Sequence, residues 1–145
     1  MNTIALVCAT DRNFALGATV MLYSAIVHLP RDTSVRVFIF DIGLDEPTRA
    51  RMTYALQRPG VPVAIEWVAP RGGSTGAQAL SPGHRAAYAR LDVAAALPSN
   101  LERVIYLDSD MLVLADLTDL YLADMGGRAL MAVQDYNISS ADALV

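Results

Sequence analysis

The chain has 145 residues, of which 54% are hydrophobic and 18% charged, and its formal net charge is −4. These values predict one globular domain over residues 1–145 with a sizeable core, and they exclude a nucleic-acid binder that tracks phosphates with a basic surface. The one cysteine, Cys8, excludes an intrachain disulfide and a cysteine-based zinc site and favours a cytoplasmic location.

The apolar segments near the N-terminus predict core elements. The first residues lack the basic start of a signal peptide, and the apolar run of residues 4–9 stops at Asp11 and Arg12. Residues 14–29 are too short and too polar to cross a bilayer. We therefore expect no membrane span and a buried helix over residues 14–29.

Strands and helices alternate through the first half of the chain. Short runs rich in β-forming residues are separated by turn residues and by segments of helical length. The pattern predicts strands over residues 4–8, 34–41 and 61–68, and helices over residues 14–29 and between Pro47 and Pro59.

The second half begins with a long loop over residues 69–83, rich in glycine, proline and serine. It continues with an alanine-rich helix over residues 84–97, a strand over 103–108, a short helical turn over 117–121 and a last strand over 129–135. Strands that alternate with helices in this way predict an α/β fold with a mostly parallel sheet.

Three of the predicted strands end in polar residues. The first is followed by "ATDRN", the strand at 103–108 runs into "DSD", and the last ends at Asp135. Open parallel sheets bind ligands outside the carboxyl ends of their strands. The three sites therefore predict a crevice for a nucleotide or a sugar.

Asp108 and Asp110 interrupt an apolar run, where an unpartnered carboxylate would be costly. Residues two positions apart on an extended chain point to the same side, so both carboxylates can reach one ligand. A magnesium or manganese ion would offset the cost, because these ions prefer hard oxygen ligands. Ser109 between them would point away or present its backbone N–H.

Other interpretations of Asp-x-Asp fit less well or stay open. A calcium-binding EF-hand loop needs glycine and glutamate where Val113 and Asp119 stand. A haloacid dehalogenase-like phosphatase expects threonine where Leu112 stands, which disfavours it without excluding it. In the plainest interpretation, a strand runs out into solvent and its acids cap the next helical turn.

The flanking sequence resembles glycosyltransferase family 8. Its "YARL" helix stands ahead of "YLDSD", and the opening "ATDRNF" precedes a helix that contains serine, an order of motifs that the family shares. The resemblance covers essentially the whole chain and implies a GT-A (Rossmann-like) fold with helices flanking the sheet. It also implies a retaining, metal-dependent transferase that moves glucose or galactose from UDP-glucose or UDP-galactose to a saccharide or lipid-linked saccharide acceptor.

The resemblance also implies roles for individual residues. Asp108 and Asp110 match the metal-binding aspartates, for manganese or magnesium, and Ser109 lies between them in the donor site. Arg90 matches the arginine that contacts the donor sugar and an acid of the metal motif. The loop that holds uracil and ribose matches Ala9, Thr10, Asp11, Asn13 and Phe14. Asp135 falls where the family's chain enters the acceptor side, and with Arg90 and Asp108 it completes the expected catalytic set.

The family continues beyond the length of this chain, and the late histidine that completes its metal site has no counterpart after Asp110. We therefore expect a fold truncated after the Asp-x-Asp region. Such a chain would be the donor-binding half of a transferase, or a transferase that borrows acceptor-side groups from a second copy in a homo-oligomer. A third interpretation is a non-catalytic module that binds UDP-sugar and metal.

Overall fold

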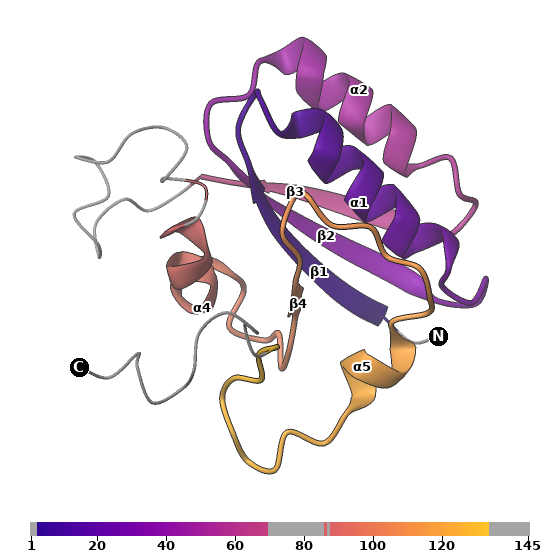
Figure 1. Ribbon diagram of the computed structural model, residues 1–145, viewed down its shortest axis with the longest axis vertical. Helices are drawn as coiled ribbons and strands as arrows, with labels where there is room; N and C mark the ends of the chain where they lie inside the picture. The colour runs from indigo at the N-terminus through magenta and orange to yellow at the C-terminus, as the bar shows by residue number, and fades with distance from the viewer. Residues whose placement is uncertain (1–2, 70–85, 87, 134–145) are drawn as a thin grey trace.

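The computed structural model describes residues 3–69, 86 and 88–133. Strands and helices alternate along this part of the chain (Figure 1). The elements are β1 (Thr3–Thr10), α1 (Ala15–Val27), β2 (Ser34–Asp41), α2 (Glu46–Leu56), β3 (Val63–Val68), the 3₁₀ turn η2 (Arg90–Asp92), α4 (Val93–Ala96), β4 (Ile105–Tyr106) and α5 (Thr118–Leu122).

Among the described residues, the sheet has four parallel strands in the order β3-β2-β1-β4. The chain therefore adds β2 and β3 on one side of β1 and then returns to place β4 on the other side. A parallel sheet whose strand order reverses in this way opens a crevice at the carboxyl ends of the two strands flanking the reversal. In this protein those strands are β1 and β4.

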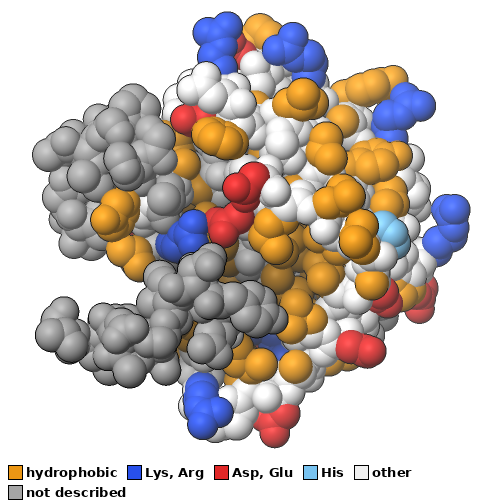
Figure 2. Space-filling view, in the orientation of Figure 1, with side chains coloured by type: hydrophobic (Ala, Val, Ile, Leu, Met, Phe, Trp, Pro, Cys, Tyr) orange, Lys and Arg blue, Asp and Glu red, His pale blue; other side chains and the backbone are white. Residues whose placement is uncertain are grey.

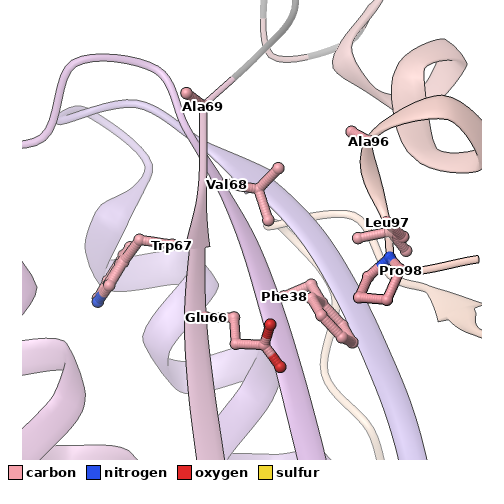
Figure 3. A pocket seen from close by; sticks show the side chains of 8 residues that line it. All are labelled: Phe38, Glu66, Trp67, Val68, Ala69, Ala96, Leu97 and Pro98. Atoms are coloured by element: carbon pink, nitrogen blue, oxygen red, sulfur yellow. The ribbon is translucent and has the colours of Figure 1, made fainter.

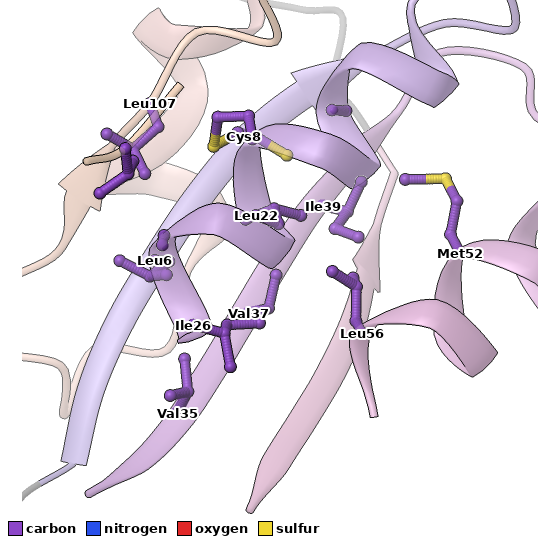
Figure 4. Close-up of a cluster of buried hydrophobic side chains, with 14 of the residues drawn as sticks. Leu6, Cys8, Leu22, Ile26, Val35, Val37, Ile39, Met52, Leu56 and Leu107 are labelled. Atoms are coloured by element: carbon purple, nitrogen blue, oxygen red, sulfur yellow. The ribbon is translucent and has the colours of Figure 1, made fainter. Parts of the chain in front are cut away.

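Alternate residues of β1 face two separate cores. On one face, Leu6 and Cys8 pack with α1 and α2 (Figure 4), and on the other Ala5 and Val7 pack with Ala89 and with residues of α4. Because both faces are covered, β1 is buried from Ile4 to its end. Burial raises the pKa of the Cys8 thiol from 9.0 to about 12.

Local signals set the helix ends. The Asp45 carboxylate accepts a hydrogen bond of 2.9 Å from the backbone N–H of Thr48, which caps α2, and Pro47 lies in the first turn. The α1 helix ends just before Leu29 and Pro30. No helix in the described ranges is long and apolar enough to cross a membrane.

The first three strands and first two helices confirm the sequence prediction, and so does the parallel α/β fold. The helix expected over 84–97 contains a 3₁₀ turn at Arg90–Asp92, and only Ile105–Tyr106 of the expected fourth strand pairs. The prediction of a last strand is wrong for residues 129–133, which form none. Leu130 is 76% and Val133 92% exposed, so these apolar side chains do not gain the burial that would favour a strand. Most of the loop predicted at 69–83 lies outside the described residues, as does Asp135.

Candidate active site at the β1–β4 edge

The Asp108–Asp110 turn begins where β4 leaves the sheet. The backbone N–H of Leu107 still bonds to the carbonyl of Val7 on β1, at 2.9 Å. The chain then turns, and the backbone N–H of Asp108 donates to the Met111 sulfur at 3.3 Å. This turn leaves the Asp108 side chain 44% exposed and Asp110 exposed, so both carboxylates can be reached from solvent.

Arg90 joins η2 to this turn. Its Nη2 donates to Asp108 Oδ1 at 2.7 Å, and its guanidinium lies over the Tyr106 ring at 5.2 Å from the centroid. A planar guanidinium can make both contacts at once, a hydrogen bond in its plane and a stacking contact on its face. Burial is the main reason why the pKa of Tyr106 is raised to about 12. The positive charge of the nearby Arg90 acts in the opposite direction and lowers this pKa.

The loop after β1 lies at the same edge of the sheet. Asp11 is buried, and its Oδ1 accepts backbone N–H bonds from Asn13 at 2.9 Å and Phe14 at 3.1 Å. These bonds fix the turn that leads into α1. They also leave Asn13 exposed and the Phe14 ring half exposed, where a flat ligand could contact them.

A hydrogen bond joins the two loops. The Ser109 hydroxyl donates to the carbonyl oxygen of Ala9 at 2.7 Å. Two hydrogen bonds, Arg90 to Asp108 and Ser109 to Ala9, therefore bring these four residues to one edge of the sheet, and Thr10 to Phe14 follow Ala9 in the chain. Asp135 cannot be placed, because it lies outside the described residues.

Two residues near this site were missed by sequence analysis. Tyr106 supports the Arg90 guanidinium, and its position two residues before Asp108 in the predicted strand over 103–108 was an available signal. Gly17 lies in the interior of α1, and a Cβ added there would be 2.6 Å from the Ser109 carbonyl oxygen. A glycine inside a helix often marks such a close approach.

One hollow of the described surface lies away from this edge of the sheet. It has a volume of about 470 Å³ and opens between the end of β3 and the segment after α4 (Figure 3). Its lining residues are Phe38, Glu66, Trp67, Val68, Ala69, Ala96, Leu97 and Pro98. None of the predicted site residues lines this hollow, so the hollow gives no support to the predicted site. In the space-filling view, acidic and basic side chains adjoin one another among hydrophobic ones (Figure 2).

Comparison with known proteins shows which family and which proteins the sequence resembles. The profile of the family described as "Glycosyl transferase family 8" matches residues 5–143. General stress protein A of Bacillus subtilis (strain 168) is 26% identical over 133 residues, which cover 90% of this chain and 46% of that protein. A probable galacturonosyltransferase-like protein 4 of Arabidopsis thaliana is 42% identical over 45 residues, 31% of this chain and 13% of that protein.

Solved structures resemble the fold. The galactosyltransferase LgtC, crystallised with donor and acceptor sugar analogues, aligns with a TM-score of 0.65 and 30% identity over 83% of this chain and 43% of its own. The bifunctional glycosyltransferase WbbM aligns with a TM-score of 0.61 and 22% identity over 82% of this chain and 20% of its own, a likeness of fold alone. The chain thus spans less than half the length of the relatives that it matches over most of its residues.

Proposed function

The chain belongs to glycosyltransferase family 8, and from that membership we propose that it binds UDP-glucose or UDP-galactose and takes part in transfer of the hexose, with retention, to a saccharide or lipid-linked saccharide. The observation that carries the proposal is the Arg90–Asp108 pair, 2.7 Å apart, at the edge where the strand order reverses. Open parallel sheets bind their ligands at such an edge.

The donor set fits a divalent cation with hard oxygen preference. Asp108 Oδ1 accepts from Arg90, yet the side chain stays 44% exposed, and Asp110 is exposed beside it. Within the described ranges no three His, Cys, Asp or Glu residues gather into a metal site. Asp108 and Asp110 would therefore hold manganese or magnesium together with water and donor phosphate oxygens, a common arrangement for magnesium. When bound, the metal supplies positive charge to the diphosphate that leaves.

The residues of the chain itself have separate tasks in this proposal. Arg90 binds the donor sugar and holds Asp108 in place, since one guanidinium can fork hydrogen bonds to two acceptors. The Asp11 turn presents Asn13 and Phe14 to the base and ribose. Ser109 belongs to the donor site through its backbone, because its hydroxyl is already bonded to Ala9. Asp135 is assigned to the acceptor side on sequence alone.

The chain spans 46% of General stress protein A and 43% of LgtC, so it corresponds to less than half of each of these proteins. For this reason the transfer of sugar by this chain is proposed and does not follow from the likeness. The donor-binding site is proposed to lie within the single domain 1–145, and acceptor-side groups from a second copy would make a homo-oligomer the active form. A UDP-sugar-binding module without turnover is the alternative that the same coverage favours. The single buried cysteine supports a cytoplasmic location.

Titration calorimetry with UDP, in the presence and absence of manganese, tests the donor site. We expect manganese to strengthen UDP binding to the wild-type chain and to have no such effect on Asp110→Ala. The exposed Asp119, which follows in α5, provides the matched control, and Asp119→Ala should respond to manganese as the wild type does.

Failure of UDP to bind in manganese, or an unchanged response in Asp110→Ala, would show that the donor site is wrongly assigned. Coupled detection of UDP release from UDP-glucose and UDP-galactose then separates the enzyme from the binding module. Release that depends on an added saccharide supports transfer, and binding without release supports the module.

A further inference from the structure

The segment from Ser109 to Val113 lies along one face of α1. The Ser109 carbonyl oxygen lies so close to Gly17 that a Cβ on this residue would be 2.6 Å from it. Farther along, the backbone N–H of Val113 donates to the hydroxyl of Ser24 at 3.0 Å. Gly17 and Ser24 are seven residues apart, about two helical turns, and so share a face of the helix.

The contacts of Gly17 with Ser109 and of Ser24 with Val113 both require a small residue on α1. A backbone clash at 2.6 Å has no flexible side chain to move, so any larger residue at 17 would displace the Ser109 peptide. Ser24 is 7% exposed, and its hydroxyl donates to the Met21 carbonyl at 2.7 Å while it accepts from Val113. A buried backbone N–H without such an acceptor would be costly.

A third contact ties the same turn to the sheet. The Ser109 hydroxyl bonds to Ala9, the residue just before the Thr10–Phe14 loop. That loop leads directly into α1. The turn is therefore held against both β1 and α1, the two elements that also carry the loop assigned to the base and ribose.

From these contacts we infer that Gly17, Ser24 and Ser109 are positioning residues, which set the distance between the Asp108–Asp110 turn and the Asp11 loop. None of their side chains needs to touch the donor. They act through the two aspartates, because a displaced turn would move the metal and diphosphate site relative to the base site. The inference rests on the proposed function, which assigns UDP to these two loops.

Gly17→Ala gives the sharpest test. The measured quantity is the manganese enhancement, defined as the ratio of the UDP dissociation constants without and with manganese. We expect Gly17→Ala to lower this ratio by about ten-fold, the size of effect usual for residues that orient metal ligands. UDP affinity without manganese should stay within about two-fold of wild type, because the Asp11 loop keeps its own hydrogen bonds.

Substitutions of Ser109 separate positioning from folding. Ser109→Ala removes the bond to Ala9 and should lower the manganese enhancement, whereas Ser109→Thr keeps the hydroxyl and should restore it. Thr19→Ala is the control on α1, since the Thr19 hydroxyl bonds only to the Ala15 carbonyl of its own helix among the contacts described. This variant should keep the wild-type enhancement.

A purely structural role would lower the melting temperature and leave the manganese enhancement of the folded protein unchanged. If UDP binds the wild type in a manganese-dependent way and Gly17→Ala and Ser109→Ala keep that enhancement, the inference is wrong and the proposed function stands. If the wild type shows no manganese-dependent UDP binding, the proposed function fails and the inference fails with it.

Discussion

The contacts of Arg90 depend on the planar shape of its guanidinium group. It bonds to Asp108 at 2.7 Å and lies over the Tyr106 ring at 5.2 Å from the centroid. An ammonium group is a compact, strongly hydrated charge without a planar face, so a lysine cannot make both contacts in the same geometry. A positive charge alone therefore does not explain why residue 90 is an arginine.

We expect Arg90→Lys to weaken binding of UDP-glucose or UDP-galactose about ten-fold relative to binding of UDP. The proposed contact of Arg90 is with the sugar, and hydrogen bonds to charged groups contribute about 1.5–3 kcal/mol. Calorimetry with UDP and each UDP-sugar measures the ratio.

The matched control is Arg58→Lys in the turn that follows α2. Arg58 also lies over an aromatic ring, at 5.5 Å from the Tyr54 centroid, and bonds to the Tyr54 hydroxyl at 2.8 Å. It is not among the proposed site residues, so its substitution should leave both affinities unchanged. Equal losses for UDP and UDP-sugar in Arg90→Lys would contradict the sugar contact.

Among the elements, α5 depends on a contact from outside itself. It has five residues, too few for a helix to be stable alone, and at its start the Asp116 carboxylate accepts a hydrogen bond from the backbone N–H of Thr118, at 2.9 Å. Arg103, just before β4, donates to the carbonyls of Tyr121 at 2.6 Å and Ala123 at 3.0 Å, which lie at the end of this helix. The Tyr121 hydroxyl donates back to the Arg103 carbonyl at 3.3 Å.

Arg103→Ala should lower the free energy of unfolding by about 1–2 kcal/mol, because two charge-assisted hydrogen bonds are lost from a partly buried site. Urea unfolding measures this change, and faster amide exchange in α5 should accompany it. Arg128→Ala, at an exposed arginine after the same helix, should change stability little. A full-sized loss in the Arg128 variant, or none in the Arg103 variant, would contradict this role for Arg103.

At the same scale, the sequence predicted what depends on local patterns. The first three strands and two helices carry their own periodicity and turn residues, and parallel strand ends share an edge, so β1 and the Asp108 turn were expected together. The prediction of a strand at 129–133 was wrong because a strand also needs another strand to pair with. A run of apolar residues does not guarantee such pairing. Contacts such as that of Gly17 with Ser109 join residues far apart in the chain, so the periodicity of the sequence cannot predict them.

For the whole molecule, stability should depend on alkaline pH through the buried thiol. Burial raises the pKa of Cys8 from 9.0 to about 12 in the folded state. The unfolded chain therefore loses this proton first, and the stabilisation that is complete below about pH 9 is lost as pH rises toward 12. The slope is at most about 1.4 kcal/mol per pH unit.

Urea unfolding of the wild type between about pH 8 and 10.5 should show this loss. Cys8→Ala starts from a lower stability, because it leaves a small cavity in the core, but its stability should fall less steeply with pH. Tyr106 remains in both proteins, and because burial is the main cause of its raised pKa and Cys8 only a minor one, it adds a similar slope to each. Parallel pH profiles would show that the thiol does not titrate as its burial requires.

The pairing of β1 with β4 also affects the order in which the chain can fold. β1, α1 and β2 are consecutive and can assemble from the first 41 residues, since β2 ends at Asp41. The bond between Ala9 and Ser109 joins residues 100 positions apart, and β4 pairs with β1 through only two residues. Long loops close more slowly than short ones, so we expect this edge of the sheet to form last. A nascent chain that ends before β4 would then hold β1, β2 and β3 without the proposed donor site, so binding of the proposed donor would report the completion of folding.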